Sequence, residues 1–557
     1  MSVAHSYCFA PRFNLYTPWP AEKFQIATDM LVSEAVSALK NQGLLVRIQF
    51  HFVLQALLIM SIAGCASVDF DYPKIDSRAL QTTDQGTLAK QFSARVAEHP
   101  GEAGFYPIYG GVDSLALRLL MAERAEFSID AQYFLIHDDL VGNAFINALL
   151  RAADRGVRVR FLLDDVLAKG LDPGLAALDA HENFEVRIFN PFAYRSARAL
   201  DVTNVSRVMR RMHNKSFTVD NQLSIIGGRN IAAEYFDARS DEKFADLDVF
   251  TVGPIVPEIS NMFDAYWNHR AAVPIAALAD APADASNALQ ILKQKIATYL
   301  EDIEASQYAD AVKSSVLNYI SSNSEALIWA SYDLVFDSPD KSGAEKVDES
   351  ELITYKMNDS VGKIEEELFV ISPYFVLRDD EIASFGALRD RDVDVTVLTN
   401  SLASNNHTSV HGGYSPSRKP LLKMGIKLYE LRAGQSAAVD KPLPRDTVIS
   451  TLHAKTFVVD KKSVFIGSFN WNQRSVNLDT ELGVIIHSPK IATQLLGRVT
   501  AALPTESFEL FLNESDKLRW KTLDNGQERI LTKEPQSGFW RRLSAKFLRF
   551  MPIKSQL

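Results

Sequence analysis

Cysteine is nearly missing from this 557-residue chain, which contains only Cys8 and Cys65. So few thiols exclude a disulfide-based scaffold and a cysteine-rich metal site. A long apolar run is missing too, because the run at 50–63 is shorter than the roughly 20 residues that a membrane-spanning helix needs. Positive charge is not in excess either: 59 Lys and Arg face 69 Asp and Glu. Non-specific nucleic-acid binders usually carry a basic surface, so the composition argues against DNA or RNA as the substrate.

The apolar run at 50–63 has the features of a secretory leader. Arg47 precedes it, and Ile62-Ala63-Gly64-Cys65 ends it. A positive flank, a short apolar stretch and small residues are typical of such a signal. The ending resembles a bacterial lipobox, in which the cysteine is lipidated and becomes the first mature residue. We therefore expect residues 1–64 to be a leader, over-extended upstream of about Leu44, and Cys65 to be a lipid anchor; a buried core helix and a short transmembrane anchor stay open.

What the chain does contain is an internal repeat. Three segments of the first half match three of the second in the same order, and they begin at Phe127 and Leu368, at Arg155 and Arg391, and at Met212 (MHNKSFTVDNQLSIIGGRN) and Leu452 (LHAKTFVVDKKSVFIGSFN). Each copy reads as strand, helix, strand, with a helical pattern at 140–153 before a β-branched run at 157–163. Alternating strands and helices imply a layered α/β sheet with crossover connections.

The fold class we expect is therefore α/β, with two pseudo-symmetric sandwich units that share one active site. The first unit should span 65–270 and the second 351–500. The range 271–350 reads as an Ala/Pro-rich linker at 271–287, then a helical insertion and a polar surface loop. Residues 501–557 form a C-terminal extension. Because both copies lie in one chain, we expect a monomer to be active.

The last pair of matching segments carries the chemistry. Each holds a His, a Lys two residues on, an Asp five residues after that, then Gly, a small residue and Asn. One copy alone would be weak evidence, but two copies of a six-position pattern are specific. The candidate catalytic residues are His213, Lys215 and Asp220 in the first copy, and His453, Lys455 and Asp460 in the second. Asn230, Ser468 and Asn470 are candidate phosphate ligands, and the glycines should let the backbone approach an anion.

These residue types suit phosphoryl transfer without a metal or a cofactor. Residues i and i+2 of a strand share a face, so each His and its Lys point to the same side. One imidazole can attack phosphorus while the other protonates the leaving oxygen, and the lysines neutralise the phosphate. Asp246 and Glu481, at matching places after the motifs, are candidates to orient the histidines. For Asp220 and Asp460 a turn role is favoured over direct catalysis.

The duplicated motif resembles the signature of the phospholipase D superfamily, over about 106–486. The resemblance implies two facing α/β units, with His213 as the nucleophile and His453 as the general acid. The chain departs from the pattern at Gly228, where the family often has Ser. Stretches such as SRVMRRMHNKSFTVD from Ser206 and VHGGY from Val410 look most like the bacterial cardiolipin synthases of the C type, and His411 and Tyr414 in the second stretch are candidates to bind the head group.

This resemblance predicts a phosphatidyltransferase that makes cardiolipin from phosphatidylglycerol and a phosphatidyl donor, phosphatidylethanolamine among the candidates. A hydrolase that releases phosphatidic acid, a nuclease and a non-catalytic lipid-binding module are the alternatives, and nothing in the residues separates transferase from hydrolase. We expect no nucleic acid, and the need for an accessory protein stays open. The expected location is the periplasmic side of a bacterial envelope, with a leaning to the outer membrane because Ala66 follows the cysteine.

The C-terminus carries a different signal. Residues 537–554 contain five basic and no acidic residues, and Phe539, Trp540, Leu543, Phe547 and Phe550 fall near one helical face. Basic, aromatic amphipathic helices lie on anionic membranes. We expect a membrane-surface helix here; a helix docked on the protein body is the alternative.

Overall fold

The structure is a computed structural model that describes residues 68–81, 84–195, 198, 201, 205–239, 241–304, 316–343, 347–435, 437–444 and 447–549. The predicted leader, with Cys65, lies outside the described residues. Within them, no helix is both long and apolar enough to cross a membrane.

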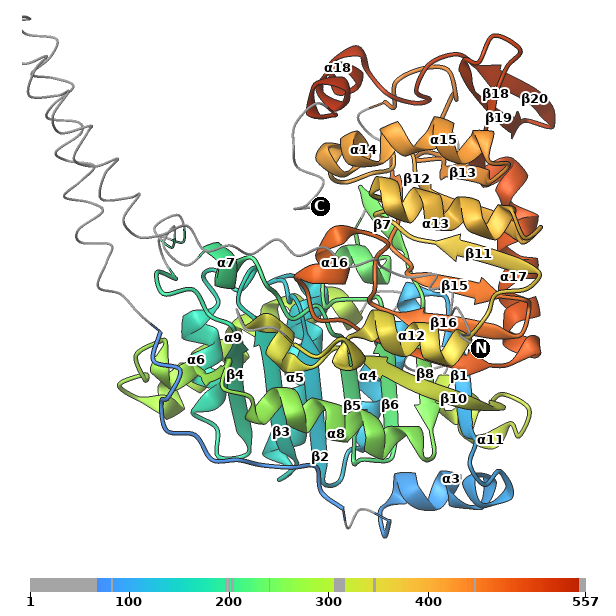
Figure 1. Ribbon diagram of the computed structural model, residues 1–557. Helices are drawn as coiled ribbons and strands as arrows, with labels where there is room; N and C mark the ends of the chain where they lie inside the picture. The colour runs from blue at the N-terminus through green and yellow to red at the C-terminus, as the bar shows by residue number, and fades with distance from the viewer. Residues whose placement is uncertain are drawn as a thin grey trace, which may run out of the picture.

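The first half is built on a mixed sheet that runs from 103 to 274 (Figure 1). Only its β2, β3 and β4 are parallel to one another. The order across the sheet is β1 (Ala103–Ile108), β8 (Asp248–Val252), β6 (Leu223–Gly227), β5 (Ser216–Val219), β2 (Ser128–Tyr133), β3 (Arg158–Asp164), β4 (Phe184–Phe189) and β9 (Ala272–Pro274).

The second half repeats this order strand for strand and then extends it. The order is β10 (Ile328–Phe336), β17 (Leu482–His487), β16 (Ser463–Gly467), β15 (Thr456–Val459), β11 (Glu367–Ile371), β12 (Asp394–Asn400), β13 (Lys427–Leu431), β18 (Ser507–Leu512), β19 (Leu518–Asp524) and β20 (Gln527–Leu531). Again only the three strands β11, β12 and β13 are parallel. The α/β fold with two pseudo-symmetric units is therefore confirmed.

The helices cover the sheets at matching places. In the predicted helical segment, Asp139 caps α5 by accepting a hydrogen bond from the Gly142 amide at 2.9 Å, and Val141, Phe145 and Leu149 are buried. The helices of the first half are α3 (Thr87–Glu98), α4 (Gly111–Arg124), α5 (Leu140–Asp154), α6 (Asp172–Asp179), α7 (Val205–Val208), α8 (Ile255–Asn268), α9 (Ala285–Glu304) and α11 (Val316–Ser322). Those of the second half are α12 (Ile353–Val361), α13 (Asp379–Arg389), α14 (Thr408–Tyr414), α15 (Arg418–Lys423), α16 (Gln473–Asn477), α17 (Pro489–Glu506) and α18 (Phe539–Leu548).

The two halves are joined by three backbone pairings and a common core. Strand β10 pairs with β1 through Ile328–Ala330 and with β17 through Ser331–Phe336. Strand β7 (Glu242–Ala245) pairs with β14 (Ile449–Leu452), and Met212 forms a bridge with Thr480. Apolar side chains of both sheets, of α8 and of α17 form one buried cluster between the halves. The last two pairings lie directly beside the two motif histidines, so the seam between the halves positions the site.

The predicted unit boundaries cut through this sheet. Residues 272–274, predicted to be linker, form β9 and pair with β4, and Ala272, Val273 and Ile275 are buried. Strand β10, in the range predicted to be an insertion, connects both sheets. An Ala/Pro-rich composition therefore concealed an edge strand, since three buried residues are too few to give a periodic pattern. The helix expected from the spacing at 289–303 is present as α9.

Candidate active site

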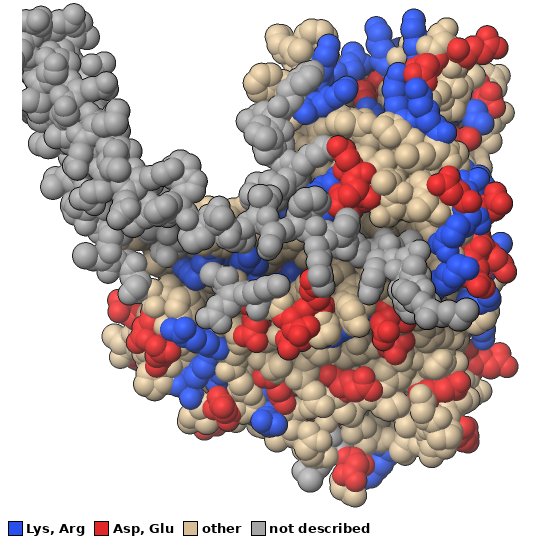
Figure 2. All heavy atoms as spheres, in the orientation of Figure 1, with Lys and Arg blue, Asp and Glu red and all other residues tan. Residues whose placement is uncertain are grey.

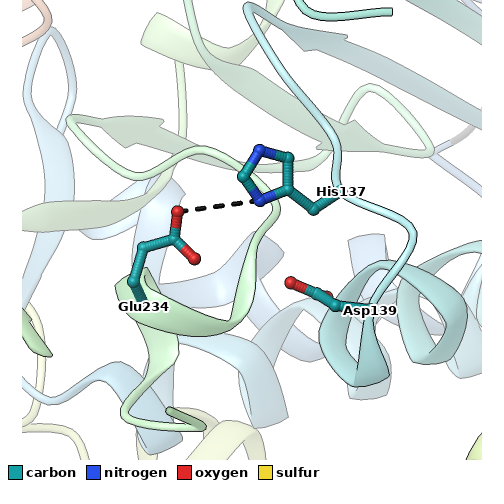
Figure 3. Close-up of side chains that lie close together, drawn as sticks. All are labelled: His137, Asp139 and Glu234. Atoms are coloured by element: carbon teal, nitrogen blue, oxygen red, sulfur yellow. Dashed lines mark ion pairs between the residues drawn. The ribbon is translucent and has the colours of Figure 1, made fainter. Parts of the chain in front are cut away.

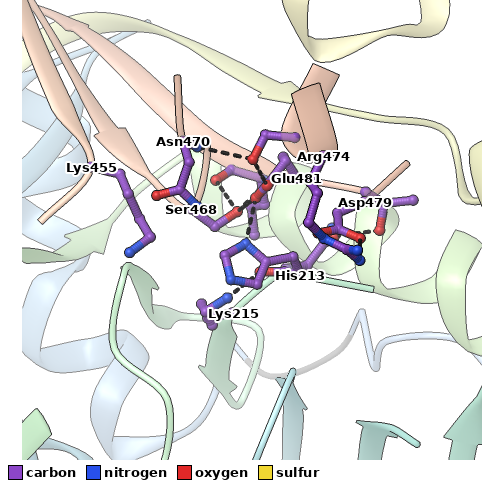
Figure 4. Close-up of polar contacts among 12 residues, drawn as sticks. His213, Lys215, Lys455, Ser468, Asn470, Arg474, Asp479 and Glu481 are labelled. Carbon is purple, nitrogen blue, oxygen red and sulfur yellow. Dashed lines mark hydrogen bonds and ion pairs between the residues drawn. The ribbon is translucent and has the colours of Figure 1, made fainter. Parts of the chain in front are cut away.

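Both His-Lys pairs lie at the seam, just before strands β5 and β15. Figure 4 shows His213 and Lys215 of the first pair, with Lys455 of the second nearby. Each lysine folds back, so that its Nζ donates to the carbonyl of the histidine two residues earlier. Nζ of Lys455 also lies 2.9 Å from Nδ1 and 3.1 Å from Nε2 of His453. In the first copy, Met212 on the other face of the segment is buried in the core between the halves. Alternation along an extended segment thus sends His213 and Lys215 to the site and Met212 to the core.

Each histidine is held by a carboxylate from the other half of the chain. Nδ1 of His213 lies 2.9 Å from a carboxylate oxygen of Glu481, and Nδ1 of His453 lies 2.6 Å from one of Asp246. The backbone repeats the exchange: the amide of His213 donates to Thr480, and that of His453 donates to Ala245. Thr480 directly precedes Glu481, and Ala245 directly precedes Asp246, so each histidine is held through its backbone and its ring by two consecutive residues. The pairing supports the orienting role proposed for them, and neither carboxylate occupies the Nε2 side of its ring.

Burial dominates the electrostatics of the site. Burial, with help from Lys455, lowers the pKa of His453 to about 3, and burial lowers the pKa of His213. Burial likewise lowers the pKa of Lys215 to about 7 and that of Lys455 to about 8. For Asp246 and Glu481 burial acts in the opposite direction, but the histidines and lysines outweigh it and lower both pKa values. The resting site therefore holds ionised carboxylates and neutral imidazoles, and a neutral imidazole is the nucleophilic form.

Aromatic rings fix the two imidazoles from the sides. Phe134 meets His213 edge-on, with ring centroids 5.0 Å apart. His453 stacks on Phe244 at 5.2 Å and meets Tyr235 edge-on at 4.9 Å. Packed rings limit rotation about the side-chain torsions, so each imidazole keeps its orientation when its hydrogen-bond partner changes.

Asp220 and Asp460 lie at the turns that follow the motif strands, where both carboxylates bind backbone amides, and a direct part in catalysis stays a prediction. Asp220 accepts hydrogen bonds from the amides of residues 126, 127 and 128 at 2.8–2.9 Å. Asp460 accepts from the amides of 365, 366 and 367 at 2.8–3.3 Å. Both have positive φ, 53° and 51°, at the turns that follow β5 and β15. Each lies seven residues after its histidine, roughly 23 Å along an extended chain. They tie the motif hairpin to the neighbouring strand, which is the turn role that the sequence favoured.

The departure at Gly228 has a steric cause. In the second copy the Ser468 hydroxyl donates to Glu481. In the first copy the shorter Asp246 lies so close that a Cβ on Gly228 would be 2.2 Å from its carboxylate oxygen. The preceding glycines are also packing residues: a Cβ on Gly467 would meet the Leu482 carbonyl at 2.4 Å. These contacts, rather than the approach of an anion, explain why glycine stands there.

The predicted phosphate ligands divide into two kinds. Asn230 and Asn470 are buried, and within the described part of the chain the side-chain oxygen of each has no hydrogen-bond partner. The Asn230 amide donates to the Tyr235 hydroxyl at 3.0 Å. The Ser468 hydroxyl, in contrast, is engaged by Glu481 and accepts from the Leu482 amide at 3.0 Å, so its role is to hold the carboxylate. Its assignment to phosphate does not fit this arrangement.

His411 and Tyr414 do not fit the head-group role proposed for them. Their exposed fractions are 1% and 2%, and both lie on α14, whose Gly412 packs against Leu548 of α18. Nε2 of His411 lies 3.5 Å from a carboxylate oxygen of Glu534. Their covering by α18 is a tertiary contact between residues far apart in the sequence, so a short polar motif could not reveal it.

Sequence reasoning missed several residues that position the motifs. Asp164, at the end of β3, accepts from the Met212 amide at 2.8 Å, and Asn400, at the end of β12, accepts from the Leu452 amide at 2.9 Å. The Ser475 hydroxyl donates to the second oxygen of Glu481 at 2.5 Å. Asp164 and Asn400 occupy the same place in the two repeats, and that alignment was the available signal.

One group of described residues has side chains suited to a cation, namely His137, Asp139 and Glu234 (Figure 3). Nδ1 of His137 lies 3.7 Å from Glu234. Both oxygens of Asp139 already accept backbone amides, those of Gly142 and Ala233, at 2.9 and 2.8 Å. The cluster thus braces the loop after β2 against the segment that follows Asn230, and its donor set is explained without an ion.

Comparison with known proteins agrees with this geometry. The sequence model of the family described as "Cardiolipin synthase, PLD-like domain" matches residues 119–267 and 359–500. The chain belongs to this phospholipase D family. It is 38% identical over 473 residues to cardiolipin synthase C of Escherichia coli (strain K12), across 84% of this chain and 99% of that protein. It is 30% identical over 514 residues to an uncharacterized protein of Helicobacter pylori (strain ATCC 700392 / 26695), across 89% and 98%.

The phospholipase D fold is also seen in a solved structure. The crystal structure of phosphatidylserine synthase from Haemophilus influenzae Rd KW20 superposes with a TM-score of 0.53 at 14% identity, over 84% of this chain and 99% of that one. At that identity the likeness concerns the fold alone. Together with the family match, it makes this chain an enzyme of the phospholipase D superfamily.

Proposed function

We propose that the protein is a phosphatidyltransferase that joins a phosphatidyl group to phosphatidylglycerol and so makes cardiolipin. The observation that carries this is the convergence of both His-Lys pairs at one seam, each imidazole oriented by the other half's carboxylate. The family membership and the likeness to a named cardiolipin synthase over nearly its full length favour a lipid phosphodiester as the substrate.

In the first step, Nε2 of His213 attacks the phosphorus of the donor lipid. A P–N bond forms and the P–O bond to the head group breaks. The leaving oxygen takes a proton from Nε2 of His453, whose imidazole is neutral in the resting site and takes up that proton when the anionic phosphate binds beside it and Asp246. In the second step, His453 takes the proton of the acceptor hydroxyl. The acceptor oxygen then attacks phosphorus, and the P–N bond breaks.

The remaining residues stabilise charge. Lys215 and Lys455 neutralise the non-bridging oxygens of the phosphate, and the side chains of Asn230 and Asn470 supply hydrogen bonds to it. Glu481 and Asp246 fix the tautomer of each imidazole and stabilise the positive charge that it gains during the reaction.

Lipid product analysis tests this function. Purified protein is incubated with vesicles of phosphatidylglycerol and phosphatidylethanolamine in EDTA, beside a His213→Ala variant and a His99→Ala control. His99 is a partly exposed histidine that pairs with Glu102, outside the site. Cardiolipin from the wild type and from His99→Ala, but not from His213→Ala, is the expected result.

Other products would point to other functions. Phosphatidic acid in place of cardiolipin would show that water, not an alcohol, takes the phosphatidyl group, which makes the enzyme a hydrolase. No lipid product, even with membrane extract added, would contradict the transferase and direct attention to nucleic-acid substrates or to a binding role.

A membrane surface is the second partner that we propose. Helix α18 packs on α14 through Ala545 and Leu548 and leaves Phe539, Trp540 and Phe547 63–75% exposed. Arg541, Arg542 and Lys546 lie on the same helix, which has no acidic residue. An exposed aromatic face flanked by cations suits an anionic bilayer. One face of α18 packs on the protein and the other faces solvent, so a helix docked on the protein body can also bind a membrane surface.

Vesicle co-sedimentation tests the surface. Trp540→Ser combined with Phe547→Ser should lower binding to phosphatidylglycerol vesicles severalfold while the melting temperature stays unchanged, because both rings face solvent. Equal binding by this variant would contradict the assignment. The lipid anchor on Cys65 remains a separate proposal, and mass spectrometry of the mature N-terminus in cells would show its diacylglycerol or exclude it.

A further inference from the structure

A second basic centre lies next to His213. Arg211 has an exposed fraction of 1%, and its guanidinium carbon lies 4.9 Å from the centroid of the Phe192 ring. Arg198 approaches the same ring at 4.8 Å. Phe192 follows the carboxyl end of β4. Arg198 and Arg211 therefore both contact one aromatic ring at the end of the sheet where the site lies.

The hydrogen bonds of these guanidinium groups are incomplete. Nη1 of Arg211 lies 3.4 Å from Asp164, whose oxygens already accept the Val166 and Met212 amides at 2.8 Å. Nε and Nη2 of Arg211 and Nε of Arg198 are buried and have no partner among the described residues. A buried donor left without an acceptor is unfavourable, so such open donors on cations point to an anionic ligand.

The position of Arg211 relates it to the reacting centre. Residues 211–213 are extended, because Arg211 accepts from the Thr480 amide and the His213 amide donates to Thr480. Residues two apart in an extended segment face the same side, about 6.6 Å apart. The three carbons of glycerol that join the two phosphates of cardiolipin bridge a comparable length.

The internal repeat shows that this centre belongs to one half only. Where the first half has Arg211 and Asp164, the second has Thr451 and Asn400. Because Thr451 occupies the matching position, the structural role that the two copies share does not require an arginine at position 211. In Figure 2, basic side chains gather in the hollow between the halves, beside α7.

We propose that Arg211, supported by Arg198, binds the phosphodiester of the acceptor lipid and presents its glycerol hydroxyl to the phosphohistidine. The proposal rests on the proposed function, which supplies an acceptor that carries its own phosphate. The planar guanidinium fork matches two phosphate oxygens, which explains why its Nε and Nη2 stay open in the protein alone.

Competition between two acceptors tests the subsite. The enzyme receives phosphatidylglycerol vesicles together with butanol, and cardiolipin and phosphatidylbutanol are measured in the same reaction. Both products come from one intermediate, so their ratio is independent of the amount of folded enzyme. For Arg211→Gln we expect the ratio of cardiolipin to phosphatidylbutanol to fall roughly 10- to 100-fold, the size expected for a lost charge-assisted hydrogen bond.

Two further variants complete the test. Arg211→Lys keeps the positive charge but loses the planar guanidinium donors, so its ratio of cardiolipin to phosphatidylbutanol should lie between those of the wild type and Arg211→Gln. The same variant replaces Arg211→Gln in the test if the latter does not fold. Arg158→Gln removes a half-buried arginine whose Nε and Nη2 are also buried without a partner among the described residues, at the opposite end of β3, and should keep the wild-type ratio. An unchanged ratio in both Arg211 variants overturns the subsite and leaves the transferase standing. A wild type that makes no cardiolipin overturns both.

Discussion

Adding a single methyl group at Gly228 should disable the enzyme through His453. A Cβ at this position would lie 2.2 Å from one oxygen of Asp246 and 2.9 Å from the other. The near oxygen also accepts the Leu247 amide at 2.8 Å, so the carboxylate cannot retreat without breaking that bond. Gly228→Ala therefore forces Asp246 away from the imidazole that it holds at 2.6 Å.

The size of the effect follows from the bond that is lost. A hydrogen bond to a charged group contributes about 1.5–3 kcal/mol, which corresponds to roughly a 10- to 100-fold fall in kcat. Overpacking adds about 1–3 kcal/mol of lost stability. Cardiolipin formation at saturating lipid measures the first quantity, and urea unfolding measures the second.

The second copy of the motif provides the matched control. Ser468→Ala removes a hydroxyl that donates to Glu481, but Ser475 still holds that carboxylate and no atom is forced to move. We expect at most about a tenfold fall, the low end of the range for a bond to a charged group, because Ser475 keeps the carboxylate in place. If Gly228→Ala kept the kcat of the wild type, the steric account of the asymmetry between the copies would be refuted.

Four further predictions concern the charged groups. Asp220→Ala should cost about 2–4 kcal/mol of unfolding free energy, because three amides lose their acceptor, while kcat per folded molecule stays within a few fold; urea unfolding with a parallel assay checks this. Burial lowers the pKa of Lys215 to about 7 and that of Lys455 to about 8, so kcat/KM should fall as pH rises from 7 to 8 and the cations that neutralise the phosphate are lost. Folding stability should change in the opposite direction and increase with pH from about 7 towards 10, since the unfolded chain keeps those protons longer; unfolding at several pH values shows the sign. Glu481→Gln and Asp246→Asn should each lower kcat by at least about 100-fold with little change in KM, because the amide cannot stabilise the charged imidazole, and steady-state kinetics separates the two terms.

Much of the fold could be predicted from the sequence because the two halves repeat the same segments in the same order. The matched segments contain β2 and β11, β3 and β12, and β5 and β15, and they are buried strands with strong apolar patterns. Short edge strands such as β9 carry too few residues for a pattern. Their existence depends on a neighbour, here β4, that only the folded sheet provides.

The candidate site was predicted in its residue types but not in its pairing. His213, Lys215, His453 and Lys455 follow from spacing alone, and strand periodicity brings each pair to one face. That Glu481 serves His213 depends on how the two sheets meet, which no local pattern encodes. The close approach of the Asp246 carboxylate to Gly228 is likewise a contact that only the folded chain provides.

Because each half orients the histidine of the other half, catalytic activity depends on the contacts between the halves being intact. Neither repeat contains a complete working imidazole, so a single copy that folded by itself would hold a motif without its carboxylate. Any opening of the β7–β14 and Met212–Thr480 contacts would separate both pairs at once, before either sheet lost a strand. Heating should therefore abolish transfer at a lower temperature than it melts the sheets.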